Sequence, residues 1–244
     1  MYSAFAPFYD YLMQDADYNG RTRYLQQLFC TYGRPPKLLL DLACGTGGFS
    51  VRFADAGCSV IGVDGSEEML AAAYEKSLGK DILYLCQPMD KLDLYGTVEG
   101  TICCLDSLNH ITDYAVLCTV FQRVALFTEP GGLFLFDVNT PYKHRNILGD
   151  RTFVWEEDNL FVSWRNSYAP ETRIVTAELD FFTPTTNGNY TRTSETICER
   201  AYSQSQLRRA LDHAGFDTLA VLGDRSLQPP AKNAERVYYV AKKG

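Results

Sequence analysis

The feature that most constrains the fold is an apolar segment that runs into a glycine-rich loop. Residues 38–42 (LLLDL) have the composition of a buried β-strand, and residues 43–48 (ACGTGG) follow directly. A second apolar segment, residues 60–63 (VIGV), ends in Asp64. A strand, a glycine loop and a second strand with a terminal carboxylate predict an α/β sheet that binds a ligand at its carboxyl edge.

Two cofactor classes use a loop of this kind, and the residues discriminate between them. A dinucleotide requires G-x-G-x-x-G, whose glycines let the pyrophosphate approach a helix N-terminus. Counted from Gly45, the sixth position is Ser50, so the third glycine is missing. Asp41 also places a negative charge where a pyrophosphate would be repelled. These residues disfavour NAD.

S-Adenosylmethionine fits the same residues better, because it has no phosphate and carries a sulfonium and an ammonium group. Asp41 is placed to meet this positive charge, directly or through water. Gly45 and Gly47 allow the backbone to approach a ligand closely. Asp64 offers acceptors for both ribose hydroxyls. The alternative is an ordinary strand-to-helix turn, which the two carboxylates at matching strand ends disfavour.

The first part of the chain alternates between strand and helix patterns. Residues 1–33 are expected to be helical, until Pro35 and Pro36 end that segment. From residue 37 the alternation predicts a mostly parallel sheet with helices on both sides. We expect strands over residues 37–42, 58–63, 81–86, 99–104 and 132–138, and helices near residues 47–56, 66–76 and 113–128.

The pattern changes near residue 150 and returns near residue 203. Residues 172–182 alternate with a period of two, and Asn187-Gly188 predicts a hairpin turn. Ser203 and Gln206 then form a capping box that begins a helix. Further strands are expected over residues 160–164, 190–198, 216–222 and 235–241. We therefore divide the chain into a domain of residues 1–150 and 203–244 and an antiparallel β insert of residues 151–202.

Composition limits the partners and the compartment. The net charge of −7 and the absence of a Lys/Arg cluster make nucleic acid an unexpected partner. No apolar run is long enough to span a membrane, and no basic segment of a signal peptide precedes Asp10 and Asp15. Most of the eight cysteines lie in apolar runs, so we expect them to be buried thiols in the cytoplasm.

Several segments resemble the motifs of one enzyme family. Residues 41–47 (DLACGTG) resemble motif I of class I S-adenosylmethionine-dependent methyltransferases, and residues 60–70 (VIGVDGSEEML) resemble the segment that follows it. The similarity continues through residues 87–90 (QPMD), 105–110 (LDSLNH) and 199–203 (ERAYS). The insert resembles that of small-molecule N-methyltransferases acting on amino sugars and glycine. The family fold is a Rossmann-like, seven-stranded, mostly parallel sheet with flanking helices.

The resemblance also implies the roles of individual residues. Gly45 and Gly47 would line the methionine moiety, Asp64 would hold the ribose, and the N-terminal segment with Tyr9 would cover the cofactor. Relatives usually have an Asp after the glutamine of the third motif, whereas this chain has Pro88. Either Asp90 takes over the contact with the adenine amine or that contact is lost, with the Met89 backbone as a remaining contact. The full set expected to bind the cofactor is Tyr9, Asp41, Ala43, Gly45, Gly47, Asp64, Gly65, Met69, Met89, Asp90 and Leu105, and no metal is expected.

The methyl acceptor is less clearly encoded. A general base is needed only when the nucleophile arrives protonated. His110 is the best candidate because it follows the fourth strand at the carboxyl edge; the alternative is a capping or loop histidine. Ser107, Asn109 and Asp106 either orient a substrate or belong to a turn. His144 follows the fifth strand and either approaches the substrate or, as we expect, is a solvated loop residue.

The expected function is therefore methyl transfer from S-adenosylmethionine to nitrogen or oxygen of a small molecule. Methylation of RNA or protein is a second hypothesis, and a module that binds the cofactor without turnover is a third. An NAD oxidoreductase is the least favoured. We keep a homodimer open as an assembly.

Overall fold

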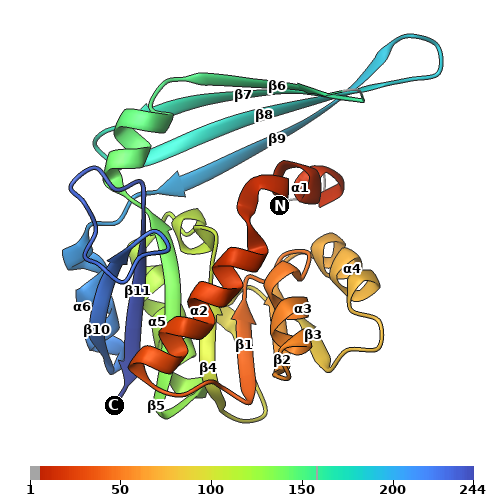
Figure 1. Cartoon of the computed structure of the whole chain (residues 1–244). Helices are drawn as coiled ribbons and strands as arrows, with labels where there is room; N and C mark the ends of the chain where they lie inside the picture. Colours follow the sequence, from red (N-terminus) through yellow and green to blue (C-terminus); the bar gives the residue numbers. More distant parts are fainter. Residues whose placement is uncertain (1–5, 158) are drawn as a thin grey trace.

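The computed structural model describes residues 6–157 and 159–244. It has two sheets, and Figure 1 shows the smaller one standing above the carboxyl edge of the larger. The larger sheet has seven strands in the order β10-β11-β5-β4-β1-β2-β3. Its strands are β1 (Leu38–Leu42), β2 (Ser59–Asp64), β3 (Ile82–Cys86), β4 (Val98–Cys103), β5 (Thr128–Asn139), β10 (Phe216–Gly223) and β11 (Arg236–Lys243).

The direction of the strands explains where a ligand is expected. Strands β1 to β5 are parallel, whereas β11 runs antiparallel to both β5 and β10. The chain moves from β1 to β2 and β3 on one side, and then returns to β4 and β5 on the other side of β1. Ligands bind outside the carboxyl ends of parallel strands at such a reversal. The predicted seven-stranded, mostly parallel sheet is confirmed.

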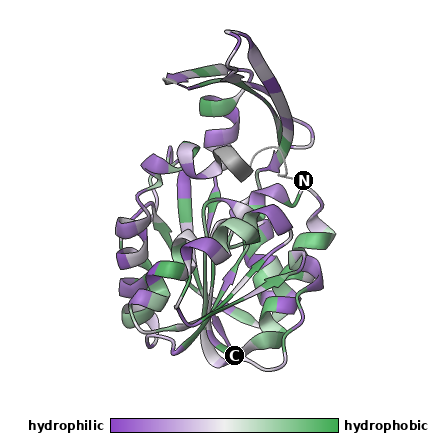
Figure 2. Ribbon diagram, turned by 90° about the vertical axis from the view of Figure 1, so that its right-hand side faces the viewer, coloured by the Kyte–Doolittle hydropathy of each residue, from purple (hydrophilic) through white to green (hydrophobic). Residues whose placement is uncertain are grey.

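Helices cover both faces of this sheet, and Figure 2 shows them on either side of it. Alternate strand residues point to opposite faces, so Leu39 packs with Phe29 and Phe53 while Leu40 belongs to a core with Phe121 and Leu211. The helices on the Leu39 side are α2 (Tyr18–Tyr32) and α3 (Gly48–Asp55), and those on the Leu40 side are α5 (Tyr114–Phe127) and α6 (Gln204–Ala214). Helix α4 (Glu67–Lys76) packs beside β3.

The smaller sheet is antiparallel and has four strands in the order β6-β7-β8-β9. These are β6 (Thr152–Glu157), β7 (Leu160–Ala169), β8 (Ile174–Pro184) and β9 (Tyr190–Arg200). Val175, Ala177, Leu179 and Phe181 are buried on one face, as the period of two predicts. This face packs on Met69 of α4 and on Tyr9 and Leu12 of α1 (Ala6–Leu12). Strand β6 was not among the predicted strands.

Other expectations can be compared with the structure. The capping box of Ser203 and Gln206 is present, and α2 ends before the two prolines. Only Cys44, Cys103 and Cys104 are buried, so the expectation that most cysteines are core residues is wrong. Phe5, at the start of the N-terminal segment, lies outside the described residues. Within the described ranges, no helix is both long and apolar enough to cross a membrane.

Candidate functional site

The loop between β1 and α3 depends on left-handed backbone conformations. Gly45 has φ 54°, and Gly47, the N-cap of α3, has φ 77°. A Cβ on Gly47 would lie 2.5 Å from the hydroxyl of Tyr84. Ala43 also has a positive φ, of 57°, although it carries a side chain. The loop is therefore a tight turn in which Gly47 leaves room for its neighbour, as the glycine spacing indicates.

Asp64 joins this loop to the next one. Its Oδ2 accepts a hydrogen bond from the backbone N–H of Gly45 at 2.9 Å, and its Oδ1 accepts one from the N–H of Ser66 at 2.9 Å. Burial raises the pKa of Asp64, and these backbone donors limit the rise. Each oxygen retains acceptor capacity, so two ligand hydroxyls fit the carboxylate.

Asp41 lies below the loop and within β1, which continues to Leu42. Its side chain is on the α3 side of the sheet, and its Oδ2 accepts a hydrogen bond of 2.5 Å from the Ser50 hydroxyl. The residue is 1% exposed. Burial raises the pKa of Asp41 to about 7. The observed contact is thus with the first turn of α3.

Helix α1 lies over the same loop. A Cβ on Gly45 would lie 3.7 Å from the ring of Tyr9, so this ring faces the glycine directly. Asp10 accepts a hydrogen bond of 2.6 Å from the Thr46 hydroxyl and forms an ion pair with Lys76 of α4. Burial raises the pKa of Tyr9 well above its usual value. The N-terminal helix is therefore fastened to the glycine loop and to α4.

The segment after β3 also reaches this edge. The Gln87 backbone N–H donates to the carbonyl of Asp64, and the Gln87 side chain is bonded to the backbone of Asp93. A short 3-10 turn, η2 (Met89–Lys91), follows Pro88. A Cβ on Gly65 would lie 3.8 Å from the Cα of Pro88, so the two loops are neighbours. Within residues 6–157 and 159–244, nothing hydrogen-bonds to the Asp90 carboxylate.

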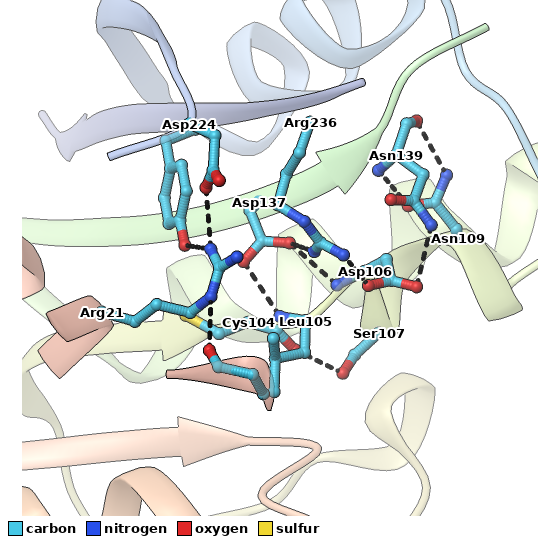
Figure 3. Close-up of polar contacts among 12 residues, drawn as sticks. Arg21, Cys104, Leu105, Asp106, Ser107, Asn109, Asp137, Asn139, Asp224 and Arg236 are labelled. Carbon is cyan, nitrogen blue, oxygen red and sulfur yellow. Dashed lines mark hydrogen bonds and ion pairs between the residues drawn. The ribbon is translucent and has the colours of Figure 1, made fainter. Parts of the chain in front are cut away.

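The loop after β4 is held in an unusual conformation. Leu105 and Asp106 both have positive φ values, of 57° and 56°. Their consecutive backbone N–H groups donate to Asp137 Oδ2 at 2.9 Å and Oδ1 at 2.8 Å (Figure 3). Asp137 is fully buried on β5. Left-handed non-glycine residues are costly, and the Asp137 carboxylate stabilises this pair.

Arg236 of β11 links the two carboxylates of this region. It forms ion pairs with Asp106 and with Asp137, and Figure 3 shows the guanidinium between them. Burial alone would raise the pKa of Asp106, but Arg236, Lys143 and His110 outweigh burial and hold that pKa well below its usual range. Asp106 is therefore an ionised carboxylate.

A second arginine fixes the start of α2 beside this network. Arg21 donates to Asp224 at 2.7 Å (Figure 3). It also donates to the Tyr238 hydroxyl at 2.6 Å and to the carbonyl of Ala16 at 2.9 Å. Tyr238 lies on β11, two residues after Arg236. The segment that follows α1 is thereby attached to the sheet.

The smaller sheet contributes a carboxylate to the same edge. Asn139 Nδ2 donates to Asp106 Oδ2 at 2.9 Å and to Glu199 Oε2 of β9 at 3.2 Å. Asp106, His110 and Glu199 each offer a metal-ligand atom, and these atoms lie within 4.8 Å of one another. Asp106 and His110 were predicted from the sequence, whereas Glu199, Asn139, Asp137 and Arg236 were given no role. Glu199 had a signal as the first residue of the family-like segment 199–203, and Asp137 and Asn139 had one in their position at the end of a strand.

Three further polar residues of the sequence analysis have clear structural partners. Asn109 is fully buried and bonds to the backbone of Asn139 and Arg200, and the Ser107 hydroxyl donates to the Cys104 carbonyl. The expectation that His144 is solvated is wrong. His144 is fully buried in a π-helical turn, η4 (Lys143–Leu148), and its Nε2 lies 3.3 Å from Glu199 Oε2.

This arrangement has two chemically distinct parts along one edge. The first offers backbone amides, glycines and the Asp64 carboxylate to a neutral or cationic ligand with vicinal hydroxyls. The second offers two carboxylates and an imidazole, a set that suits a cation or a proton transfer. Tyr9 lies at the first part, and Glu199 lies at the second.

Comparison with known proteins gives consistent matches. Residues 39–132 match the family model described as a methyltransferase domain. The curated protein named "Putative methyltransferase GWCH70_2453", from Geobacillus sp. (strain WCH70), is 33% identical over 245 residues, which cover 99% of either chain. The crystal structure of an S-adenosylmethionine-dependent methyltransferase from Clostridium acetobutylicum is 30% identical, covers 100% of this chain and 99% of its own, and superposes with a TM-score of 0.88.

A more distant structure shares the fold. The X-ray structure of the sugar N-methyltransferase KedS8 from Streptoalloteichus sp. is 21% identical, with a TM-score of 0.78. The match covers 95% of this chain and 92% of that one, so it includes both sheets. At this identity the likeness concerns the arrangement of the elements alone.

Proposed function

The chain belongs to the class I S-adenosylmethionine-dependent methyltransferases, and from this premise we propose that it methylates a nitrogen or an oxygen of a small molecule. S-Adenosylmethionine is its cofactor. The observation that carries the proposal is the position of β9, which brings Glu199 to the carboxyl edge beside Asp106 and His110. An acceptor that reaches these residues lies between the two sheets.

The cofactor site is proposed at the loops after β1, β2 and β3. Two acceptor positions remain on the Asp64 carboxylate for the ribose hydroxyls, and the turn at Gly45 and Gly47 leaves space for the methionine moiety. Asp90, without a hydrogen-bond partner in the described part of the chain, is the proposed contact of the adenine amine. The remaining proposed contacts are Tyr9, Asp41, Ala43, Gly65, Met69, Met89 and Leu105.

The proposed mechanism depends mainly on positioning. When bound, the cofactor supplies an electrophilic methyl group on its sulfonium. The protein has to orient the nucleophile in line with that methyl group and to exclude water, and orientation of this kind contributes up to roughly 7–11 kcal/mol. Tyr9 and the apolar face of the smaller sheet would exclude water, and His110 would accept a proton from the acceptor. Residues 151–202 are the proposed cover of the acceptor.

A small molecule is favoured over RNA or protein for two reasons. The net charge of −7 opposes binding of a phosphate backbone. KedS8, whose fold includes the same second sheet, is named a sugar N-methyltransferase. A cytoplasmic location and a homodimer belong to the same proposal.

The test is to follow the methyl label. The purified enzyme is incubated with S-[methyl-³H]adenosylmethionine and an extract of a bacterium, and the products are separated by ultrafiltration. We expect the label in the small-molecule filtrate, and we expect His110→Ala to abolish this labelling while it retains cofactor affinity. Label that remains with RNA or protein contradicts the proposed acceptor class. Cofactor binding without any labelling supports a binding module instead.

A further inference from the structure

Glu199 occupies a special position on the smaller sheet. It lies opposite Val175 on the face that also carries Ala177 and Ile197, so it points the same way as the apolar core of that sheet. Its side chain is only 14% exposed. A carboxylate on an apolar face requires partners that compensate for its desolvation.

The partners of Glu199 fix it as an anion. Asn139 Nδ2 lies 3.2 Å from Oε2, and His144 Nε2 lies 3.3 Å from the same oxygen. Burial alone would raise the pKa of Glu199, but the neighbouring His144 and His110 side chains hold it below the usual value. Neither Nδ1 nor Nε2 of His144 has a hydrogen-bond partner among the described residues. Asn139 therefore provides the hydrogen bond that holds the Glu199 carboxylate.

The nearby cations are already paired elsewhere. Arg236 forms its ion pairs with Asp106 and Asp137, and the Lys143 ammonium donates to the side-chain Oδ1 of Asn139. Within the described part of the chain, Glu199 has no ion pair with Lys or Arg. The edge between the sheets therefore carries a carboxylate that neither of these cations neutralises by direct contact.

We propose that Glu199 selects the acceptor: its carboxylate, held by Asn139, binds the ammonium group of a primary or secondary amine beside Asp106 and His110. This inference rests on the proposed function and narrows it from nitrogen or oxygen to an amine nitrogen. The ammonium is the cation that the site lacks, and its two or three N–H groups can donate to acceptors of this cluster.

The proton balance of the step follows from the same geometry. The bound ammonium transfers one proton to His110, and Asp106 and Glu199 stabilise the resulting imidazolium. The lone pair of the neutral amine then forms the N–C bond while the S–C bond breaks, which leaves an N-methylammonium and a thioether. The proton on His110 passes to solvent after product release. Glu199 thus contacts the substrate directly.

Two other occupants of the cluster are less consistent with the contacts. A divalent cation would have to share Asp106 with Arg236 and Asn139, and the guanidinium would repel it. An alcohol would bring no charge to compensate Glu199, and it would demand a much stronger base than an imidazole. The experiment distinguishes a bound divalent cation and a methylated alcohol from a methylated amine.

The experiment compares matched amines and alcohols as methyl acceptors. Benzylamine and benzyl alcohol, cyclohexylamine and cyclohexanol, and glucosamine and glucose are each incubated with labelled S-adenosylmethionine and enzyme, with and without EDTA. We expect methylation of amines only, unchanged by EDTA. For the best amine, Glu199→Gln should lower kcat/KM by roughly 10- to 100-fold and weaken its calorimetric binding to the S-adenosylhomocysteine complex by a similar factor.

The controls separate a lost charge from a damaged fold. Glu195→Gln removes the same charge from the same face of β9, four residues from Glu199 and outside its cluster with Asp106 and His110, and it should leave kcat/KM within about twofold. Glu199→Asp retains the charge and should recover part of the loss. Cofactor affinity should be the same in all three variants, which shows that each is folded.

Several results would overturn the inference. Equal methylation of alcohols, or no methylation of any amine in the panel, contradicts amine selection. A loss of kcat/KM in Glu195→Gln that equals the loss in Glu199→Gln contradicts the role of Glu199. Activity that EDTA removes and a divalent cation restores assigns the cluster to a metal. Methylated alcohols leave the proposed small-molecule function intact, whereas label found only on RNA or protein overturns both.

Discussion

The two parts of the carboxyl edge are built by different means. We call the loops around Gly45 and Asp64 the proposed cofactor part, or cofactor part, and the cluster of Asp106, His110 and Glu199 the proposed acceptor part, or acceptor part. At the cofactor part, Asp64 bonds to backbone N–H groups of Gly45 and Ser66, which are 19 and 2 residues away in sequence. At the acceptor part, side chains bond to side chains: Asp106 meets Arg236 across 130 residues, and Asn139 meets Glu199 across 60 residues. The first part is local and depends on the backbone, whereas the second depends on tertiary packing.

This difference suggests that the two parts respond differently to amino-acid substitutions. A backbone site keeps its shape as long as the loop conformations persist, so it suits a cofactor that does not vary. A site of side chains on β4, β5, β9 and β11 is altered by single substitutions. We therefore expect variants of the acceptor part to change stability or acceptor use, and variants of the cofactor part to change cofactor affinity.

The largest effect is expected from Arg236→Met. The guanidinium is buried between Asp106 and Asp137, so its removal leaves two buried carboxylates without their ion-pair partner. Loss of one partner from a buried ion pair costs about 3–5 kcal/mol. Urea denaturation should show this loss, and Arg225→Met, at an exposed ion pair with Asp17, should cost at most about 1 kcal/mol. Equal stability of the two variants would show that the acceptor part does not depend on the Arg236 network.

A smaller effect is expected from Gly47→Ala in the cofactor part. Gly47 has φ 77°, and the new Cβ would lie 2.5 Å from the Tyr84 hydroxyl. Strain and overpacking together should cost roughly 2–4 kcal/mol. Gly57→Ala is the matched control, because Gly57 has φ 90° but nothing within 4 Å of the new Cβ. Only Gly47→Ala should also weaken cofactor binding, and an unaltered affinity would remove this glycine from the site.

The strands and the glycine loop of the proposed cofactor part were predicted well because their determinants are local. Apolar runs and turn residues located the strands to within one or two residues in most cases, and the glycine spacing identified the loop after β1. Asp64 follows its strand directly, so strand order alone brings it to Gly45. β5 is a partial exception, because it begins at Thr128 rather than near residue 132.

The side-chain contacts of the acceptor part were not predicted, because tertiary packing brings these residues together from distant positions in the sequence. Nothing near His144 in the sequence shows that η4 turns it under the smaller sheet toward Glu199. Arg236 and Asp137 meet because β11 and β5 are neighbouring antiparallel strands, which the sequence does not specify. Strand β6 was missed for a related reason, since its Trp155 and Phe153 are stabilised by Trp164 of the next strand.

Asp64 is expected to bind the cofactor independently of the acceptor part. Isothermal titration of S-adenosylmethionine into the wild type, Asp64→Ala and His110→Ala measures this independence. Asp64→Ala removes charge-assisted hydrogen bonds and should weaken binding by roughly 1.5–3 kcal/mol, whereas His110→Ala should bind like the wild type. An unchanged dissociation constant for Asp64→Ala would show that Asp64 does not bind the cofactor. An equal loss of affinity in both variants would show that the two parts are not independent.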